Sequence, residues 1–417
     1  EMGCSPATQQ LALNLSSLIV LELRASWGVT GQQDFSPYQW RTLYATDDYG
    51  DMPAIVLNQL GNDRLKWERS KQFDLGVDYS LFEDRLSGTV GYYEKNTEDA
   101  IFTAISPGST GFSSVQANVG STSNKGLEFE IRADIIRSDS FNWSLGLNTN
   151  KNTNKLTEIS DDFKDEDGFV TGFGGGGLLK EGSPIGLIYG YVSEGIFQEQ
   201  GEIDALNANS PTGNYQEAGT SPGDLRFADL NNDGVVNALD QEVIGDTQPD
   251  FFGGFNNTFT YKSFSLSTLF NFSVGNDLHW FNQARSINFA NSYFGENKTT
   301  EVLNAWTPEN PTDQPRVVYG DPNNNDRISS YYVYDASYLR LKTVNLQYSF
   351  PNETLNKFGF LNSAAVYVTG QNLLTFTNYP GADPEASNLY NNDISAGRDN
   401  NRYPISRVFT AGVKIGF

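Results

Sequence analysis

Apolar and polar residues alternate one by one along several long segments of the chain, whereas helical periodicity is nearly absent. The segment 73–81 places a large side chain at every second position, namely Phe73, Leu75, Val77, Tyr79 and Leu81. The same alternation recurs over 127–135, 141–147, 264–274 and 409–417. A period of two residues is that of a β-strand with one apolar and one polar face.

The length of these segments separates two kinds of β-protein. Strands of soluble sandwiches average roughly 5–6 residues, but a tilted strand needs about 9–11 residues to cross a bilayer. Only a closed barrel leaves no unpaired backbone groups in lipid. The pattern therefore predicts an all-β fold, an antiparallel transmembrane β-barrel whose apolar faces contact lipid. The polar faces then line a wet or plugged interior.

Connection lengths support a barrel independently. We predict about ten strands, near 21–30, 67–81, 85–95, 125–136, 141–151, 251–261, 263–274, 338–350, 363–374 and 407–417. Short or medium connections fall at 82–84, 137–140, 261–263 and 351–361, and long loops run over 31–66, 97–122, 153–250, 275–333 and 375–405. Short and long connections alternate, as outer-membrane barrels do with periplasmic turns and extracellular loops.

Two segments depart from the simple pattern. Residues 185–197 look strand-like, but a spanning strand there would break the alternation of connections, so we expect an outer loop or a hairpin. Residues 339–350 change phase near Lys342 and Thr343. The phase change predicts a β-bulge or the edge of the membrane.

Composition excludes several classes of protein. The chain has 417 residues and a formal charge of −23, from 51 acidic and 28 basic residues, which argues against a nucleic-acid partner. No stretch reaches the roughly 18 apolar residues of a membrane-spanning helix. The single cysteine, Cys4, excludes an intrachain disulfide. We expect Cys4 to be incidental, because no apolar run precedes it as in a lipid anchor.

Several segments resemble the SusC/RagA-like family of TonB-dependent transporters of Bacteroidetes. They are 23–31 (LRASWGVTG), 65–68 (LKWE), 126–128 (GLE), 370–375 (GQNLLT), 379–381 (YPG) and 383–385 (DPE). The terminal Phe417 resembles the aromatic signal of outer-membrane barrels. The resemblance covers residues 21–417, which it identifies as the C-terminal portion of such a barrel, about ten of its about 22 strands. Residues 1–20 stay unassigned.

The resemblance implies location in the bacterial outer membrane and import of oligosaccharides or peptides. It also implies a SusD-like surface lipoprotein as a lid, and TonB as the energy source, acting on a plug domain. That plug domain is expected to be absent from residues 1–417. Membrane lipid is then a further partner of the barrel.

A twelve-residue segment fits a calcium loop. Its expected ligands are Asp229, Asn231, Asp233, the carbonyl of Val235, Asn237 and Asp240, with Gly234 at the sixth position. Calcium prefers six to eight oxygen ligands, and this spacing supplies most of them. The alternative is an acidic Asn/Asp/Gly turn without metal. We expect a structural Ca²⁺ rather than a catalytic one.

Three other features predict no chemistry of their own. The run Gly172–Gly177 lacks the Gly-Lys-Ser/Thr ending of a phosphate loop, so we expect an outer loop. A solvated or cation-binding surface is expected from the acidic residues Asp161, Asp162, Asp165, Glu166 and Asp167. The lone His279 is interpreted as a loop histidine, because no serine is marked as its nucleophilic partner.

Aromatic residues suggest two different uses. An interfacial girdle is expected of Tyr92, Tyr93, Tyr348, Phe350 and Tyr379, which lie near predicted strand ends. Loop aromatics could instead stack on sugar rings, and the candidates are Trp280, Phe281, Tyr331 and Tyr332. The sequence does not separate these two uses.

Three functions compete at this point. The first is outer-membrane nutrient import without enzymatic activity. The second is an outer-membrane barrel enzyme of the lipase or protease type, which would depend on His279. The third is a secreted β-rich adhesin, soluble without detergent. Apolar faces pressed together between two stacked sheets would contradict the barrel and the importer.

Overall fold

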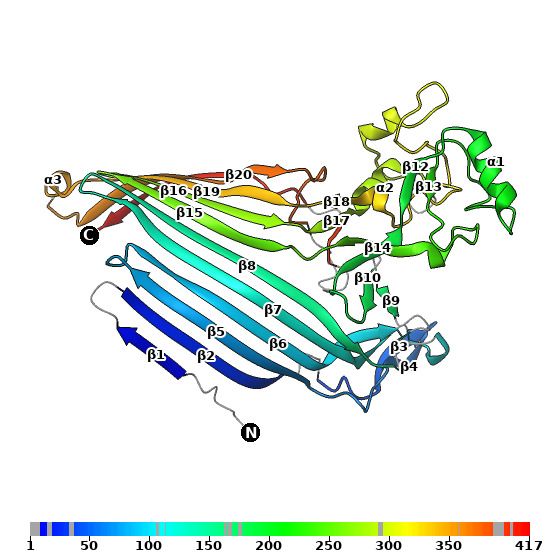
Figure 1. Cartoon of the computed structure of the whole chain (residues 1–417), viewed down its shortest axis with the longest axis horizontal. Coiled ribbons are helices and arrows are strands. Elements are labelled where there is room, and N and C mark those ends of the chain that lie inside the picture. The colour runs from blue at the N-terminus through cyan, green and yellow to red at the C-terminus, as the bar shows by residue number, and fades with distance from the viewer. Residues whose placement is uncertain are drawn as a thin grey trace.

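The computed structural model describes residues 9–14, 19–32, 37–105, 108–112, 114–161, 164, 169–173, 177–290, 295–357, 359–386, 396–400 and 403–417. One large curved sheet dominates the molecule, and a lobe of smaller elements gathers at one end of its strands (Figure 1). Within these ranges, no helix combines the length and apolar character that crossing a membrane requires. Cys4 lies outside the described residues.

The large sheet has eleven strands, and each pairs antiparallel with the next sheet strand along the chain. They are β1 (Gln9–Asn14), β2 (Ile19–Gln32), β5 (Glu68–Leu81), β6 (Leu86–Ile105), β7 (Ser114–Arg137), β8 (Phe141–Ile159), β15 (Phe251–Tyr261), β16 (Phe264–Val274), β19 (Tyr338–Ser349), β20 (Ser363–Thr377) and β22 (Val408–Gly416). All ten predicted strands are present. The eleventh, β1, lies within residues 1–20, which the sequence left unassigned.

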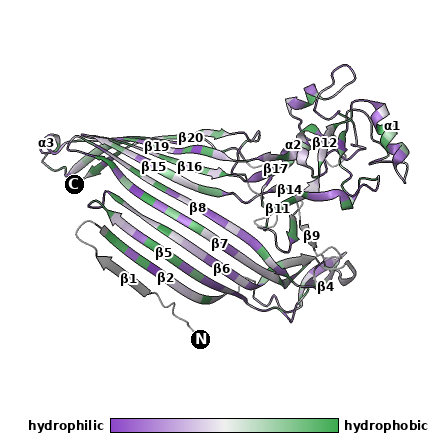
Figure 2. Cartoon of the chain, viewed as in Figure 1, coloured by the Kyte–Doolittle hydropathy of each residue, from purple (hydrophilic) through white to green (hydrophobic). Residues whose placement is uncertain are grey.

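The strand register collects the apolar side chains on one face of the sheet. Leu23 lies opposite Val77, Val77 opposite Val90, and Val90 opposite Phe129. Alternating apolar and polar positions are visible along the strands in Figure 2. Large side chains of this face are exposed across the sheet, among them Trp27, Leu127, Phe264 and Val413. The apolar faces are therefore not pressed between stacked sheets, and this surface suits lipid.

Most buried apolar residues of the described chain lie instead at the end of the sheet that carries the lobe, with Leu355 and Ala365 as exceptions at the other end. One cluster packs the ends of β7 and β8 against β10 (Gly177–Lys180), with Ala117, Val119, Leu156, Ile159, Leu179 and Ile185. The largest cluster lies wholly in the lobe and comprises Phe197, Ile203, Tyr215, Leu225, Phe227, Val236, Ala284, Ile287 and Tyr332. The lobe thus has its own hydrophobic core, which fixes it as a folded unit rather than a set of loose loops.

Connections at the two ends of the sheet differ, as predicted. Only a few residues join β5 to β6, β7 to β8, and β15 to β16, while β19 and β20 are joined through the short helix α3 (Asn352–Leu355). The C-terminus lies at this same end (Figure 1). Long insertions leave the opposite end, so the alternation of short and long connections is confirmed for the described strands.

The long insertions contain structure of their own. The first holds the hairpin of β3 (Leu43–Tyr49) and β4 (Met52–Gln59). Two later insertions and part of a third build the lobe from β9 (Phe169–Phe173), β10, β11 (Leu187–Tyr191), β12 (Ser193–Ile196), α1 (Gln200–Asn209), β13 (Leu225–Phe227), β14 (Gln241–Asp246), β17 (Asp277–Trp280), α2 (Phe281–Ile287), β18 (Val333–Asp335) and β21 (Arg398–Asp399). The strand-like segment 185–197 is confirmed as part of this outer region.

Three strands extend further than predicted. Residues 97–105 and 114–122, expected in a loop, continue the pairing of β6 with β7, and β8 continues to Ile159. In these extensions the apolar side chains pack into a cluster at the outer end instead of facing lipid, among them Ala117, Val119 and Leu156. The bulge near Lys342 is confirmed, since Leu341 pairs with Leu374 but Thr343 pairs with Gln371.

Candidate functional site: the polar face and its outer mouth

Ionic and hydroxyl side chains cover the polar face of the first strands. Arg24 on β2 forms an ion pair with Asp78 on β5. The Thr89 hydroxyl donates to the same carboxylate at 2.6 Å, and the Ser26 hydroxyl donates to Asp74 at 3.1 Å. Arg24 balances the charge of Asp78, and hydroxyl donors satisfy both acids, so this part of the wall is polar and well hydrogen-bonded.

Amide side chains continue the polar face on β7 and β8. Asn154 donates through Nδ2 to Oδ1 of Asn124 at 2.8 Å, and Asn150 donates to Glu128 at 3.3 Å. The Tyr93 hydroxyl donates to Oδ1 of Asn152 at 2.8 Å. Amides offer both donors and acceptors, so this surface can exchange hydrogen bonds with a hydrated polar solute.

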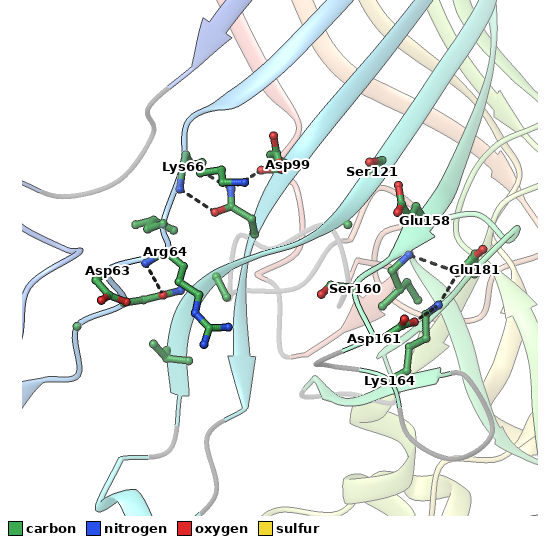
Figure 3. A pocket seen from close by; sticks show the side chains of 18 residues that line it. Asp63, Arg64, Lys66, Asp99, Ser121, Glu158, Ser160, Asp161, Lys164 and Glu181 are labelled. Atoms are coloured by element: carbon green, nitrogen blue, oxygen red, sulfur yellow. Dashed lines mark hydrogen bonds and ion pairs between the residues drawn. The ribbon is translucent and has the colours of Figure 1, made fainter.

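A cavity of about 1270 Å³ opens at the outer end of β6, β7 and β8. One side is the segment 61–66, which leads into β5, and the other side carries Glu158, Asp161 and Glu181 (Figure 3). Asn118 on β7 fastens the segment 61–66 to β6, because its Oδ1 accepts from the Lys66 amide at 2.8 Å and its Nδ2 donates to the Asp99 carbonyl at 2.6 Å.

The cavity lining carries both signs of charge. Lys164 lies 3.1 Å from both Asp161 and Glu181. The hydrogen bond from Lys164 holds the pKa of Glu181 below its usual value, and the Glu181 and Asp161 carboxylates raise the pKa of Lys164. Arg64 and Lys66 line the other side. Such a mixed lining suits a polar solute that is neutral or carries both charges.

The loop predicted for calcium folds as a series of tight turns. Both oxygens of Asp229 accept backbone amides, and the nearer donor is Gly234 at 2.8 Å. Gly234 has φ +85°, which glycine adopts at little cost. Asp240 is fully buried and accepts amides of Leu230 and Asn237 at 2.9 and 2.8 Å.

The acids of this loop do not form a metal cage by themselves. Across the described residues, no three His, Cys, Asp or Glu side chains are grouped closely enough to hold a metal ion. Calcium bound here would therefore draw further ligands from the amide oxygens of Asn231 and Asn237 and from the Val235 carbonyl. The donor set of hard oxygens is of the type that calcium prefers.

His279 is buried in β17 and is not the loop histidine that the sequence predicted. Strands β18 and β21, which come much later in the chain, pair with β17 and cover it. Burial, with a smaller effect of Arg398, lowers the pKa of His279 to about 3. Neither ring nitrogen has a hydrogen-bond partner among the described atoms. A nucleophilic triad needs such partners, so this histidine lacks the geometry of one.

Several aromatic predictions are corrected by burial. Tyr332 is fully buried and donates to the Asn325 carbonyl at 2.9 Å, so it cannot stack on a sugar. Tyr379 is buried in the lobe and donates to Asp399, and Tyr93 lies on the polar face, so neither belongs to a girdle. Tyr348 does lie at the short-turn end. Its ring centroid is 4.8 Å from that of Phe264.

Two predicted surface features fall partly outside the described residues. Within the acidic run, Asp161 is described and borders the cavity, but Asp162, Asp165, Glu166 and Asp167 are not. The glycine run is also divided. Gly172 and Phe173 end β9 and Gly177 begins β10, whereas 174–176 lie outside the described residues.

A buried ionic cluster at the outer end of β19 was not predicted. Arg340 forms ion pairs with Asp383 and Glu385, and both Arg340 and Asp383 are 3% exposed. Tyr338 donates to Glu385 at 2.9 Å. The cluster fastens the segment after β20 to the sheet. The family-like DPE sequence at 383–385 was the only hint of this cluster in the sequence. It did not indicate that Arg340 would be the partner of these acids.

Known proteins similar to this chain share its sheet. The family described as TonB dependent receptor-like, beta-barrel, matches residues 16–184. TonB-dependent receptor P3 of Formosa agariphila is 38% identical over 99% of this chain and 41% of that protein. TonB-dependent receptor SusC of Bacteroides thetaiotaomicron is 26% identical over 100% of this chain and 39% of that protein. The solved RagAB peptide transporter is 26% identical with a TM-score of 0.78, over 97% of this chain and 41% of that chain.

The chain is similar to TonB-dependent receptors over nearly its whole length. The resemblance to their SusC/RagA-like branch is confirmed, and so is the fold as part of an outer-membrane β-barrel. The chain spans about two fifths of the length of the relatives it matches. Its apolar face is the lipid-facing surface of an outer-membrane protein, and its polar face is the interior wall.

Proposed function

We propose that this chain forms part of the interior wall and the outer mouth of an importer. The importer takes up oligosaccharides or peptides. The observation that supports import most is the continuous polar face beneath a cavity of about 1270 Å³ at the outer end. Hydrogen-bonding amides and paired charges let a hydrated solute exchange water for protein groups at little net cost. Similarity to TonB-dependent receptors supports transport rather than catalysis.

Uptake by living cells tests the proposal. The gene that encodes this chain would be deleted, and uptake of labelled oligosaccharides and labelled peptides would be measured with and without complementation. We expect uptake of one class to fall and complementation to restore it. Inactivation of TonB should reduce the same uptake, because the proposed transport is TonB-driven. Unchanged uptake of both classes after deletion would reject the proposal.

Variants of the polar face connect uptake to this wall. Asn124→Leu and Asn152→Leu remove amides that face the interior, whereas Val344→Leu alters only the lipid-facing side. We expect the two asparagine variants to reduce uptake several-fold at equal amounts in the membrane, and Val344→Leu to leave it unchanged. Equal uptake by all three variants would show that this polar surface does not contribute to transport.

The partner proposed for the outer end is a SusD-like surface lipoprotein. The folded lobe, with its own hydrophobic core, lies at the outer end of the strands, where it offers a surface to a partner outside the cell. Affinity purification of the protein from outer membranes should recover such a lipoprotein in equal amount. Recovery without it, in a mild detergent that preserves other outer-membrane complexes, would contradict this part of the proposal.

Calcium is proposed as a structural ion of the loop 229–240. The spacing of oxygen ligands and the left-handed Gly234 support it. Calcium should raise the melting temperature of the lobe, and Asp233→Asn should abolish that increase. Asp204→Asn, an exposed acid of α1, serves as the control for loss of one charge. An equal calcium effect in both variants would reject the site.

We also propose that the chain has no hydrolytic activity. The alternative enzyme depended on His279, which is buried without partners for its ring nitrogens among the described atoms. The purified unaltered protein should show no more esterase or protease activity than the purified His279→Gln variant. Activity that this substitution removes would revive the enzyme hypothesis.

A further inference from the structure

Two apolar hollows lie side by side on the lipid-facing surface near its outer end. The first, of about 440 Å³, is lined by Leu127, Phe129, Leu147, Thr149, Lys151, Phe251 and Phe272. The second, of about 580 Å³, shares Phe251 and Phe272 with it and reaches Leu339 and Phe376. The shared rings are packed edge to face at 6.1 Å, so they form a ridge between the hollows.

A glycine lies beside the first hollow, between two strands that line it. Gly253 on β15 lies opposite Thr149 on one neighbouring strand and Phe272 on the other. A Cβ at this position would lie 2.1 Å from the backbone oxygen of Asn148, so no other residue fits without moving the sheet. The absence of a side chain leaves a recess among the large apolar groups around it.

A lysine stands at the rim of this recess. Lys151 on β8 lies opposite Leu127, so it belongs to the outer part of the apolar surface rather than to the polar face. Among the described side chains it takes part in no ion pair. The neighbouring Lys125, by contrast, is paired with Glu94 at 3.0 Å. In a chain of net charge −23, Lys151 is thus an outward cation that no ion pair among the described side chains balances.

Lipid chemistry matches this combination. A lysine at the edge of a bilayer extends its ammonium group toward the lipid headgroups. The ammonium group is stabilised there when it lies beside an anionic headgroup. The acid at the second hollow, Asp335, already accepts hydrogen bonds from the amide and the hydroxyl of Ser337 at 2.8 and 2.5 Å. Because the long insertions leave this end, the surface faces the outer leaflet.

We propose that this surface binds one phosphorylated lipid of the outer leaflet. Its phosphate contacts Lys151, and its acyl chains occupy the two hollows on either side of the Phe251–Phe272 ridge. A lipid with several chains fits better than one with a single chain, because the ridge divides the surface in two. The inference depends on the orientation of the barrel and not on the identity of the imported solute.

Native mass spectrometry of the full-length protein in detergent tests the proposal. Phosphorylated multi-acyl lipid extracted from the outer membrane would be titrated against its dephosphorylated form. We expect one lipid per protein with preference for the phosphorylated form. Lys151→Gln should weaken its binding about fivefold, the effect of roughly 1 kcal/mol per interfacial cation. Equal binding of the two lipid forms by the unaltered protein would overturn the proposal.

Two further variants make the test specific. Lys262→Gln removes a charge from a turn at the opposite end of the sheet, so it should leave binding of the phosphorylated lipid unchanged. Thr149→Phe fills the recess without changing charge and should weaken both lipid forms. Each variant is first checked for folding by its heat-dependent migration on a gel. An equal loss of phosphate preference in Lys151→Gln and Lys262→Gln would also overturn the proposal.

Discussion

Arg340 illustrates how much a single buried charge can depend on its partners. The side chains of Arg340 and Asp383 are both 3% exposed, and Glu385 completes the cluster. Removing one member of a buried ion pair typically costs about 3–5 kcal/mol, because the remaining charge loses both water and partner. We expect Arg340→Met to destabilise the outer end by that amount. Hydrogen exchange of the segment 379–386 would detect the loss.

An exposed ion pair supplies the control for Arg340. Arg132 lies 2.8 Å from Glu130, but its side chain is 75% exposed. Exposed pairs contribute about 0–1 kcal/mol. Arg132→Met should therefore leave exchange at 379–386 unchanged. Similar exchange in both variants would mean that the Arg340 cluster does not hold this segment.

Asp326 gives the lobe a predicted response to acid. Burial, and next the Asp321 carboxylate, raise the pKa of Asp326 from 3.8 to about 6. An acid with a higher pKa in the folded state stabilises the fold most at low pH, and this contribution is lost as the pH rises through about 6. Other groups titrate too, so the comparison is made with Asp326→Asn.

Melting of the lobe between pH 3.8 and pH 7 tests the role of Asp326. Over this interval the unaltered protein should lose stability with rising pH relative to Asp326→Asn, whose amide does not titrate. A stability difference between the two proteins that stays constant with pH would show that Asp326 titrates normally. Asp204→Asn, at an exposed position of α1, should follow the unaltered protein.

At the scale of the strand, adjacent positions face different solvents. On β19, Val344 points to the lipid side and Asn345 to the interior, where Asn345 accepts a hydrogen bond from Thr369 at 2.7 Å. A lysine in the middle of the lipid face costs about 2–4 kcal/mol. We expect Val344→Lys to lower the free energy of unfolding in lipid vesicles by this amount. Asn345→Lys should lower it by about 1 kcal/mol or less.

Urea unfolding of the two β19 variants, in vesicles of defined thickness, provides the measurement. The two substitutions introduce the same charge one residue apart, so they differ mainly in the face they occupy. A larger loss for Asn345→Lys than for Val344→Lys would reverse the assignment of the faces.

The strands also show where sequence patterns stop being informative. Alternation located all ten predicted strands because each was half exposed to lipid over most of its length. It failed for residues 97–105 and 114–122, which continue β6 and β7 beyond the apolar band. There the apolar side chains pack into a cluster at the outer end rather than against lipid, so the sequence pattern predicts a loop. These side chains are Phe102, Val115, Ala117 and Val119.

For the whole molecule, the two ends of the sheet should face different compartments. Single cysteines would be placed in a Cys4→Ser background at Asp84, in a short turn, and at Asn310, in a long insertion. We expect a membrane-impermeant reagent to label Asn310→Cys in intact cells. Asp84→Cys should react only after the outer membrane is opened. If only Asp84→Cys were labelled in intact cells, the assigned orientation of the barrel would be wrong.

The sequence by itself determined the class of fold, the strands and their two faces, because a spanning strand must satisfy lipid and water at alternate residues. The bulge at Lys342 was also readable, since one extra residue reverses that alternation. Tertiary structure decided what lies at the outer end. Burial of His279, Tyr332 and Tyr379, and the pairing of Arg340 with Asp383, join segments that are 20 to more than 100 residues apart in the chain. No local pattern encodes such contacts, because they arise only when separate insertions pack into one lobe.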